Sequence, residues 1–131
     1  MRVLILLIAL TTLTGWTHAA GLSGTYKGTW SSANEGSGDL TMTFRPGDSD
    51  KPDAEVSFTN EGATIKCVVK YLTITEGSKV ELVLNYEMNG NQYETTVLGV
   101  LEGKTLSGTY KSKSLADNSP ADSGTWKATA T

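Results

Sequence analysis

The chain has 131 residues, a formal net charge of −3 and a single cysteine, Cys67. This length suits one domain with one modest hydrophobic core. The 11 Lys and Arg residues are scattered along the chain, which argues against binding to nucleic acid or to an anionic membrane surface. A lone cysteine excludes an internal disulfide.

Residues 1–20, "MRVLILLIALTTLTGWTHAA", have the features of a secretory signal peptide. Arg2 gives the charged start, and an apolar run follows from Val3 to Leu10. The small residues Ala19 and Ala20 then provide a cleavage site. The apolar run is too short to span a membrane, which takes about 20 residues. We therefore expect a secreted or periplasmic protein with no membrane span in its mature part.

The remaining part, residues 21–131, is expected to form a single all-β domain. It shows no helical periodicity, but short alternating runs rich in Val, Thr, Tyr and Leu are separated by turn signals. These runs predict eight strands, at 22–32, 38–45, 53–60, 63–75, 78–88, 91–102, 105–114 and 122–130. Asn89-Gly90 is the strongest turn signal because both residues tolerate positive φ.

Short turns predict which residues oppose one another in the sheet, and opposed residues share a face. The two-residue turns are placed at Glu61-Gly62, Glu76-Gly77, Asn89-Gly90 and Gly103-Lys104. They pair Phe58 with Ile65, Tyr71 with Leu82, Val69 with Leu84, Tyr86 with Tyr93, and Leu101 with Leu106. Each pairing extends one apolar face across the next strand. The strand-borne charges fall on the other face, with Asp122 at a strand start as the exception.

An eight-stranded antiparallel meander with one apolar face can close into an up-and-down barrel or fold into a two-sheet β-sandwich. The barrel is favoured because it leaves no exposed edge strand. One phrase, Ser-Gly-Thr-Tyr-Lys or Ser-Gly-Thr-Trp-Lys, occurs at 23–27, 107–111 and 123–127. Barrel closure pairs the first strand with the last, so we expect the first and third copies to lie side by side.

The opening strand, "GLSGTYKGTW", resembles the Gly-x-Trp opening of lipocalins and the Gly-Thr-Trp opening of avidin-like proteins. The motif covers Gly24 to Trp30, while the strand pattern covers the whole of 21–131. The chain is also similar to small exported bacterial domains that end in Ser-Gly-Thr-Trp. This calycin-like resemblance implies a small exported β-barrel that holds a ligand inside. Gly28 stands where the avidin-like site has Asn, so the resemblance does not imply biotin.

The sequence offers little for catalysis. The only histidine, His18, lies in the predicted signal peptide, which excludes Ser-His-Asp and Cys-His arrangements from the mature chain. Cys67 is expected to face inward as a small buried hydrophobe. The loop carrying Asp48, Asp50 and Asp53 lacks the glycine and distal Glu of a calcium loop and is interpreted as a polar turn. We expect a non-enzymatic protein without a cofactor or a metal.

Aromatic side chains dominate the predicted inward face. The candidate ligand-binding residues are Tyr26, Trp30, Tyr71, Tyr86, Tyr93, Tyr110 and Trp126. Thr95 and Ser112 add hydroxyls to the same face, and a buried Tyr hydroxyl needs a hydrogen-bond partner. Two interpretations stay open. The rings fill the space left by inward glycines, or they line a pocket for a small neutral, apolar or aromatic molecule.

A second apolar set is predicted on the outer face, and contiguous exposed apolar residues can mark an interface. The set contains Val68, Leu72, Ile74, Val83, Leu98 and Val100. The alternative function is therefore a protein-binding or self-associating module with a packed core, such as an exported inhibitor. A homodimer would form through Leu72, Ile74, Leu98 and Val100.

Overall fold

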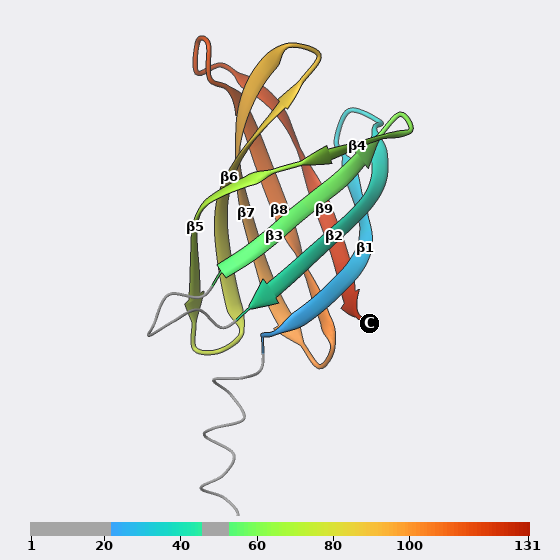
Figure 1. Ribbon diagram of the computed structural model, residues 1–131, viewed down its shortest axis with the longest axis vertical. Helices are drawn as coiled ribbons and strands as arrows, with labels where there is room; N and C mark the ends of the chain where they lie inside the picture. The colour runs from blue at the N-terminus through green and yellow to red at the C-terminus, as the bar shows by residue number, and fades with distance from the viewer. Residues whose placement is uncertain (1–21, 46–52) are drawn as a thin grey trace, which may run out of the picture.

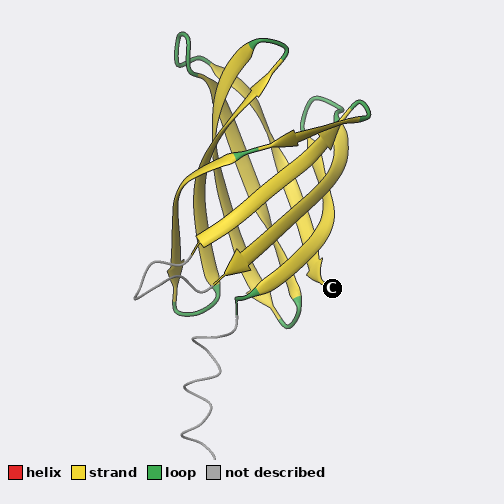
Figure 2. Cartoon of the chain, viewed as in Figure 1, coloured by secondary structure: helices red, strands yellow, loops and turns green. Residues whose placement is uncertain are grey.

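The computed structural model describes residues 22–45 and 53–131. These residues form nine antiparallel strands in one curled sheet (Figure 1), and the connections that the structure describes are short (Figure 2). The strands are β1 (Gly24–Ser32), β2 (Ser37–Arg45), β3 (Asp53–Asn60), β4 (Ala63–Lys66), β5 (Val68–Thr75), β6 (Lys79–Met88), β7 (Asn91–Glu102), β8 (Thr105–Ser114) and β9 (Pro120–Ala130). No helix long and apolar enough to cross a membrane occurs in the described ranges.

The strands follow the order β4-β3-β2-β1-β9-β8-β7-β6-β5 across the sheet. The all-β antiparallel meander is confirmed, but the number of strands differs from the prediction. The expected strand 63–75 is divided at Cys67, so that β4 pairs with β3 while β5 pairs with β6. The two outermost strands of the order are therefore neighbours in the chain. The Cys67 amide donates a hydrogen bond to the Val56 carbonyl at 2.9 Å.

The predicted register is confirmed at three of the four turns. Phe58 opposes Ile65, Tyr86 opposes Tyr93, and Leu101 opposes Leu106. Local geometry explains the success at Asn89-Gly90, where φ is 55° and 81°. Positive φ at both central residues gives the turn a twist that matches the flanking strands.

The predicted register is wrong at the turn between β5 and β6. Glu76 and Gly77 have positive φ, as a two-residue turn requires, and the Ser78 amide donates to the Thr75 carbonyl at 3.2 Å. However, Thr75 opposes Lys79 in the ladder, so Ser78 is an extra residue in the connection. This one extra residue shifts every pairing of the adjoining part of β5.

The shift changes which side chains face the interior, because a one-residue slip moves each side chain to the other face. Tyr71 opposes Val83 instead of Leu82 and is 50% exposed on the outside. Leu72 and Ile74, predicted to face outward, pack against the core.

A β-bulge between Val69 and Tyr71 shifts the register by one residue and so restores the predicted pairing beyond it. Val69 therefore opposes Leu84 as predicted. The error is confined to the part of β5 between the bulge and the turn.

The repeated phrase forms a pair between β8 and β9. Ser107–Lys111 opposes Ser123–Lys127 along its whole length, so that Gly108 faces Trp126 and Tyr110 faces Gly124. Each glycine thus lies opposite the aromatic ring of the other copy. The first and last strands do pair, as expected, but Lys27 opposes Thr129. The prediction that the first copy lies beside the third is therefore wrong.

The hydrophobic core lies inside the curl of the sheet. Its buried members are Leu22, Tyr26, Leu40, Met42, Phe44, Ala54, Val56, Val80, Leu82, Leu84, Val97, Leu106, Trp126 and Ala128. Tyr26, near the start of β1, packs edge-on against Phe44 with ring centroids 5.7 Å apart. Tyr26 is thus part of the filled core.

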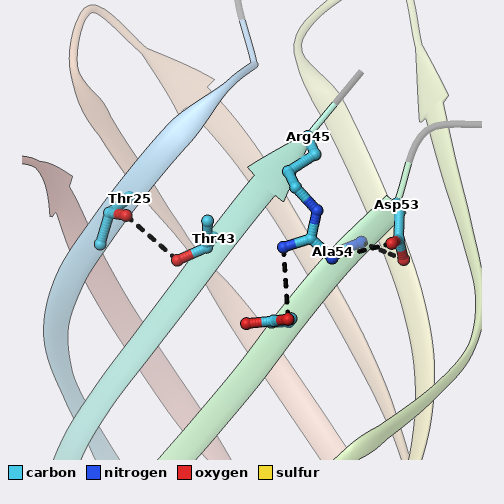
Figure 3. A network of polar contacts seen from close by, with 6 residues as sticks. Thr25, Thr43, Arg45, Asp53 and Ala54 are labelled. Atoms are coloured by element: carbon cyan, nitrogen blue, oxygen red, sulfur yellow. Dashed lines mark hydrogen bonds and ion pairs between the residues drawn. The ribbon is translucent and has the colours of Figure 1, made fainter. Parts of the chain in front are cut away.

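Charged side chains on the outer face form exposed ion pairs between β2 and β3 (Figure 3). Arg45 contacts Asp53 at 2.9 Å and Glu55 at 3.3 Å. The Arg45 guanidinium and the Ala54 amide together hold the pKa of the Asp53 carboxyl below its usual range. Exposed pairs of this kind add little to stability.

The Asp-rich turn predicted from the sequence is only partly visible. Asp48 and Asp50 lie outside the described residues, and Asp53 is paired with Arg45. Within 22–45 and 53–131, no group of three or more His, Cys, Asp or Glu side chains is arranged to hold a metal ion.

Candidate ligand-binding cavity

A cavity of about 340 Å³ opens at the end of the curled sheet where the β1–β2, β3–β4, β6–β7 and β8–β9 connections lie (Figure 1). The lining includes Asn34 and Gly36 from the first of these connections, Asn60 and Met88 from strand ends, and Ala121 from the start of β9. Pockets for small molecules typically hold about 300–1,000 Å³. The space is therefore large enough for a small organic ligand.

Five aromatic rings form a continuous arc along the cavity wall. In spatial order they are Tyr110, Trp30, Phe58, Tyr86 and Tyr93, from β8, β1, β3, β6 and β7. The first three contacts are edge-to-face, with centroids 6.3, 5.9 and 5.0 Å apart, and Tyr86 stacks on Tyr93 at 5.4 Å. Both geometries are favourable for aromatic pairs. The fold thus collects distant parts of the sequence into one aromatic surface, which we call the ring arc.

Trp126 lines the same cavity and is almost fully buried. Its indole N–H donates to the carbonyls of Leu98 and Thr109, each at 3.2 Å. The ring lies against Gly99, where an added Cβ would come within 2.5 Å of the Trp126 Cζ2 atom. The neighbouring Gly108 has no room for a Cβ either, because the β7 backbone approaches it closely. Trp126 thus occupies the space beside the inward Gly99 and also lines the cavity.

Trp30 is held in a similar way, by a backbone carbonyl and a neighbouring glycine. Its indole N–H donates to the Thr59 carbonyl at 3.0 Å. A Cβ at Gly38 would come within 2.8 Å of the Trp30 Nε1 atom. With their N–H groups bonded to backbone carbonyls, both indoles present apolar surface to the cavity, so packing and lining are served by the same side chains.

Asp122 brings a carboxylate to the cavity. One of its oxygens accepts a hydrogen bond from the Ser32 hydroxyl at 2.6 Å, and the other accepts one from the Tyr110 hydroxyl at 3.0 Å. Burial, reinforced by Asp122, raises the pKa of Tyr110 above its usual value. The phenol therefore stays protonated at neutral pH and acts as the donor.

A second polar spot lies deeper in the same interior. The Thr95 and Ser112 hydroxyls are buried and lie 2.6 Å apart, on the opposed strands β7 and β8. Burial raises the pKa of the Tyr86 hydroxyl, and the Ser112 and Thr95 hydroxyls oppose this rise. These groups are neutral at physiological pH and supply hydroxyls to the aromatic wall.

Cys67 also lines the cavity, at the point where the strand divides. Burial raises the pKa of its thiol to about 12. The thiolate is the nucleophilic form of cysteine, and it is scarcely populated at neutral pH with such a pKa. The geometry offers Cys67 as an apolar lining group, in line with the sequence interpretation.

The seven candidate residues from the sequence divide into three groups. The structure places five on the cavity wall, namely Trp30, Tyr86, Tyr93, Tyr110 and Trp126. Tyr26 lies in the filled core, and Tyr71 lies on the outer face because of the register shift.

Sequence reasoning missed Phe58, Ser32 and Asp122 as lining residues. A signal for Asp122 was present, because it has the same inward parity along its strand as Gly124 and Trp126. Asp122, the one strand-borne charge that was not predicted on the outer face, lies in the cavity lining.

Comparison of the chain with protein-family models, with curated proteins and with solved structures gives no significant match. The functional argument therefore rests on the cavity itself.

Proposed function

We propose that this protein is an exported, non-enzymatic binding protein that holds a small apolar or aromatic molecule in the cavity. The observation that carries the proposal is the cavity of about 340 Å³ walled by the ring arc. Few polar groups and many aromatic ones are typical of ligand pockets. The export part rests on the signal-peptide pattern of residues 1–20, which lie outside the described residues, and it implies a secreted or periplasmic location.

The proposal includes closure of the curled sheet into a calycin-like barrel. The support is the division at Cys67, because the outermost strands β4 and β5 follow each other directly in the chain. In this arrangement the two segments act as one strand whose first part pairs with β3 and whose second part pairs with β6. A closed barrel protects strand edges and encloses a ligand on all sides.

The binding proposal can be tested by narrowing the cavity mouth. Ala121 is exposed and lines the cavity, so Ala121→Trp places a large ring at the entrance without disturbing the core. We expect naphthylethanol, a neutral aromatic probe, to bind the wild type and to bind Ala121→Trp at least about tenfold more weakly. Isothermal titration calorimetry measures the affinity.

The matched control is Ala116→Trp, which adds the same ring to the exposed β8–β9 loop, away from the cavity lining. It should bind naphthylethanol like the wild type. The proposal fails if neither this probe nor a broad panel of small aromatic molecules binds. Equal affinity of the two tryptophan variants would also count against the cavity as the site.

The second candidate function, self-association, has a different surface from the one predicted. Leu72 and Ile74 are partly buried and pack against the core, so the dimer surface that we propose omits them. Leu98 and Val100 are exposed on β7, together with Tyr71 and Val68 on β5. A homodimer through this revised set would appear in light scattering as a doubled mass that Leu98→Glu abolishes. A monomer at millimolar concentration would rule it out.

A further inference from the structure

The described cavity lining carries a negative charge at one position. Among the lining residues that the structure describes, Asp122 is the only charged one. An ionised carboxylate can accept about four hydrogen bonds, and Asp122 has two protein donors, both uncharged hydroxyls. Within the described ranges, no Lys or Arg forms an ion pair with it. The carboxylate therefore has spare acceptor capacity and no counter-ion among the residues that the structure describes.

The aromatic rings next to this carboxylate also favour a positively charged ligand. Tyr110 donates to Asp122 and packs edge-to-face against Trp30. The faces of aromatic rings carry partial negative charge and attract cations, with Trp and Tyr among the best. The Trp30 N–H is bonded to the Thr59 carbonyl, so the positive edge of this indole is already occupied. Carboxylate and ring faces together attract a cation and repel an anion.

We propose that the ligand is a protonated amine carried on an apolar or aromatic body, with its ammonium group at Asp122 and its body along the ring arc. This inference rests on the proposed binding function and deepens it by naming the class of ligand. The ammonium supplies the counter-ion that Asp122 lacks, and a charge-assisted hydrogen bond is stronger than a neutral one. The body of the ligand reaches towards Tyr86 and the Thr95–Ser112 hydroxyls.

A purely structural role for Asp122 is the competing explanation. Its two hydrogen bonds connect β9 to Ser32 at the end of β1 and to Tyr110 on β8, so it could simply fix the cavity rim. A rim-fixing role predicts a loss of stability when Asp122 is changed, but no preference for ligand charge. The two explanations therefore differ in a measurable way.

The test compares three probes that share one body: naphthylethylamine, naphthylethanol and naphthylpropionate, titrated calorimetrically into the protein at pH 7. We expect the amine to bind about tenfold or more tightly than the alcohol, and the carboxylate to bind most weakly. Asp122→Asn keeps the shape and should bring the amine to the affinity of the alcohol. Asp122→Glu keeps the charge and should retain a preference for the amine.

The matched control is Asp53→Asn, which makes the same charge change on the outer face beside Arg45. It should leave the preference unchanged. If Asp122→Asn does not fold, the wild type still decides the matter. Binding of the amine should weaken as salt is raised from low to molar concentration, while binding of the alcohol should not.

Two outcomes overturn the inference while leaving the binding function intact. One is equal affinity of the wild type for the amine and the alcohol. The other is an amine preference that survives in folded Asp122→Asn. If none of the three probes binds and a broader panel of apolar and aromatic molecules also fails, the binding function itself is overturned.

Discussion

Single side chains show how the interior combines packing with an accessible lining. Trp30 and Trp126 each satisfy their N–H group on a backbone carbonyl and occupy space that glycines leave free. Such side chains are fixed before any ligand arrives, which lowers the entropy cost of binding. Tyr110 is fixed by Asp122 in the same sense. The cavity wall is therefore preorganised residue by residue.

Cys67 gives a prediction for the alkaline range. Burial raises its pKa from 9.0 to about 12 in the folded protein. When the pKa of a group is higher in the folded state than in the unfolded state, its contribution to the free energy of unfolding is complete at pH values below the unfolded pKa. This contribution is lost as the pH rises towards the folded pKa. We expect the free energy of unfolding to fall between about pH 9 and pH 12, and Cys67→Ala to lose less over this window.

Urea unfolding of both proteins at a series of pH values measures the effect. Burial also raises the pKa values of the Tyr86 and Tyr110 hydroxyls, and the comparison with Cys67→Ala separates the contribution of the thiol from theirs. Native thiol alkylation at pH 8 should also be slow and should become fast in urea. Rapid alkylation of the native protein would contradict the assignment.

The residue scale also shows what the sequence could reveal about the site. Strand parity alone predicted that Trp30, Tyr86, Tyr93, Tyr110 and Trp126 face inward. It could not separate Tyr26 from the lining residues, because filled and open parts of an interior have the same alternation. Asp122 was visible as an exception, but one of its two hydroxyl partners, Ser32, lies on the first strand, 90 residues away in the sequence.

At the scale of elements, β5 is the place where prediction from sequence failed. Asn89-Gly90 allows one geometry, so the register of β6 and β7 could be predicted. The segment Glu76-Gly77-Ser78 is compatible with a connection of two residues or of three, and each length sets a different register for β5. The strand itself, "VVKYLTIT", carries apolar residues on both faces, so alternation could not choose the register. The compensating bulge left no signal of its own.

The register of β5 can be tested with paired substitutions. Leu72→Asp puts a charge among core residues and should lower the free energy of unfolding by several kcal/mol, roughly 3 or more. Tyr71→Asp changes the neighbouring residue, which is exposed, and should lower the free energy of unfolding by less than about 1 kcal/mol. Urea unfolding monitored by circular dichroism measures both. A larger cost for Tyr71→Asp would support the register predicted from sequence instead.

At the scale of the whole molecule, the sheet order divides the chain into two meanders. The first contains β1 to β4 and the second contains β5 to β9, and within each meander consecutive strands pair. The alternating pattern was enough to predict an antiparallel meander, but it did not predict the division of the expected strand 63–75 into β4 and β5. The position of the cavity was not predictable, because it depends on how the rings from both meanders fill one end of the interior.

The pairing of β1 with β9 has a consequence for the order in which the protein is made. Tyr26 opposes Ala130, and the amide of the last residue, Thr131, donates to the Thr25 carbonyl at 3.0 Å. The middle of the sheet is thus completed by β9, which is synthesised after the eight other described strands. Contacts between such distant residues are slow to form because the intervening chain must first be ordered.

Until β9 is available, β1 and β8 both present an open edge, and each edge can pair with another chain. A nascent or truncated chain that ends before Pro120 should therefore collapse slowly and self-associate, and stopped-flow refolding with light scattering would show it. The order of the chain thus fixes when the sheet can be completed, because the eleven residues of β9 must be present before β1 and β8 lose their open edges.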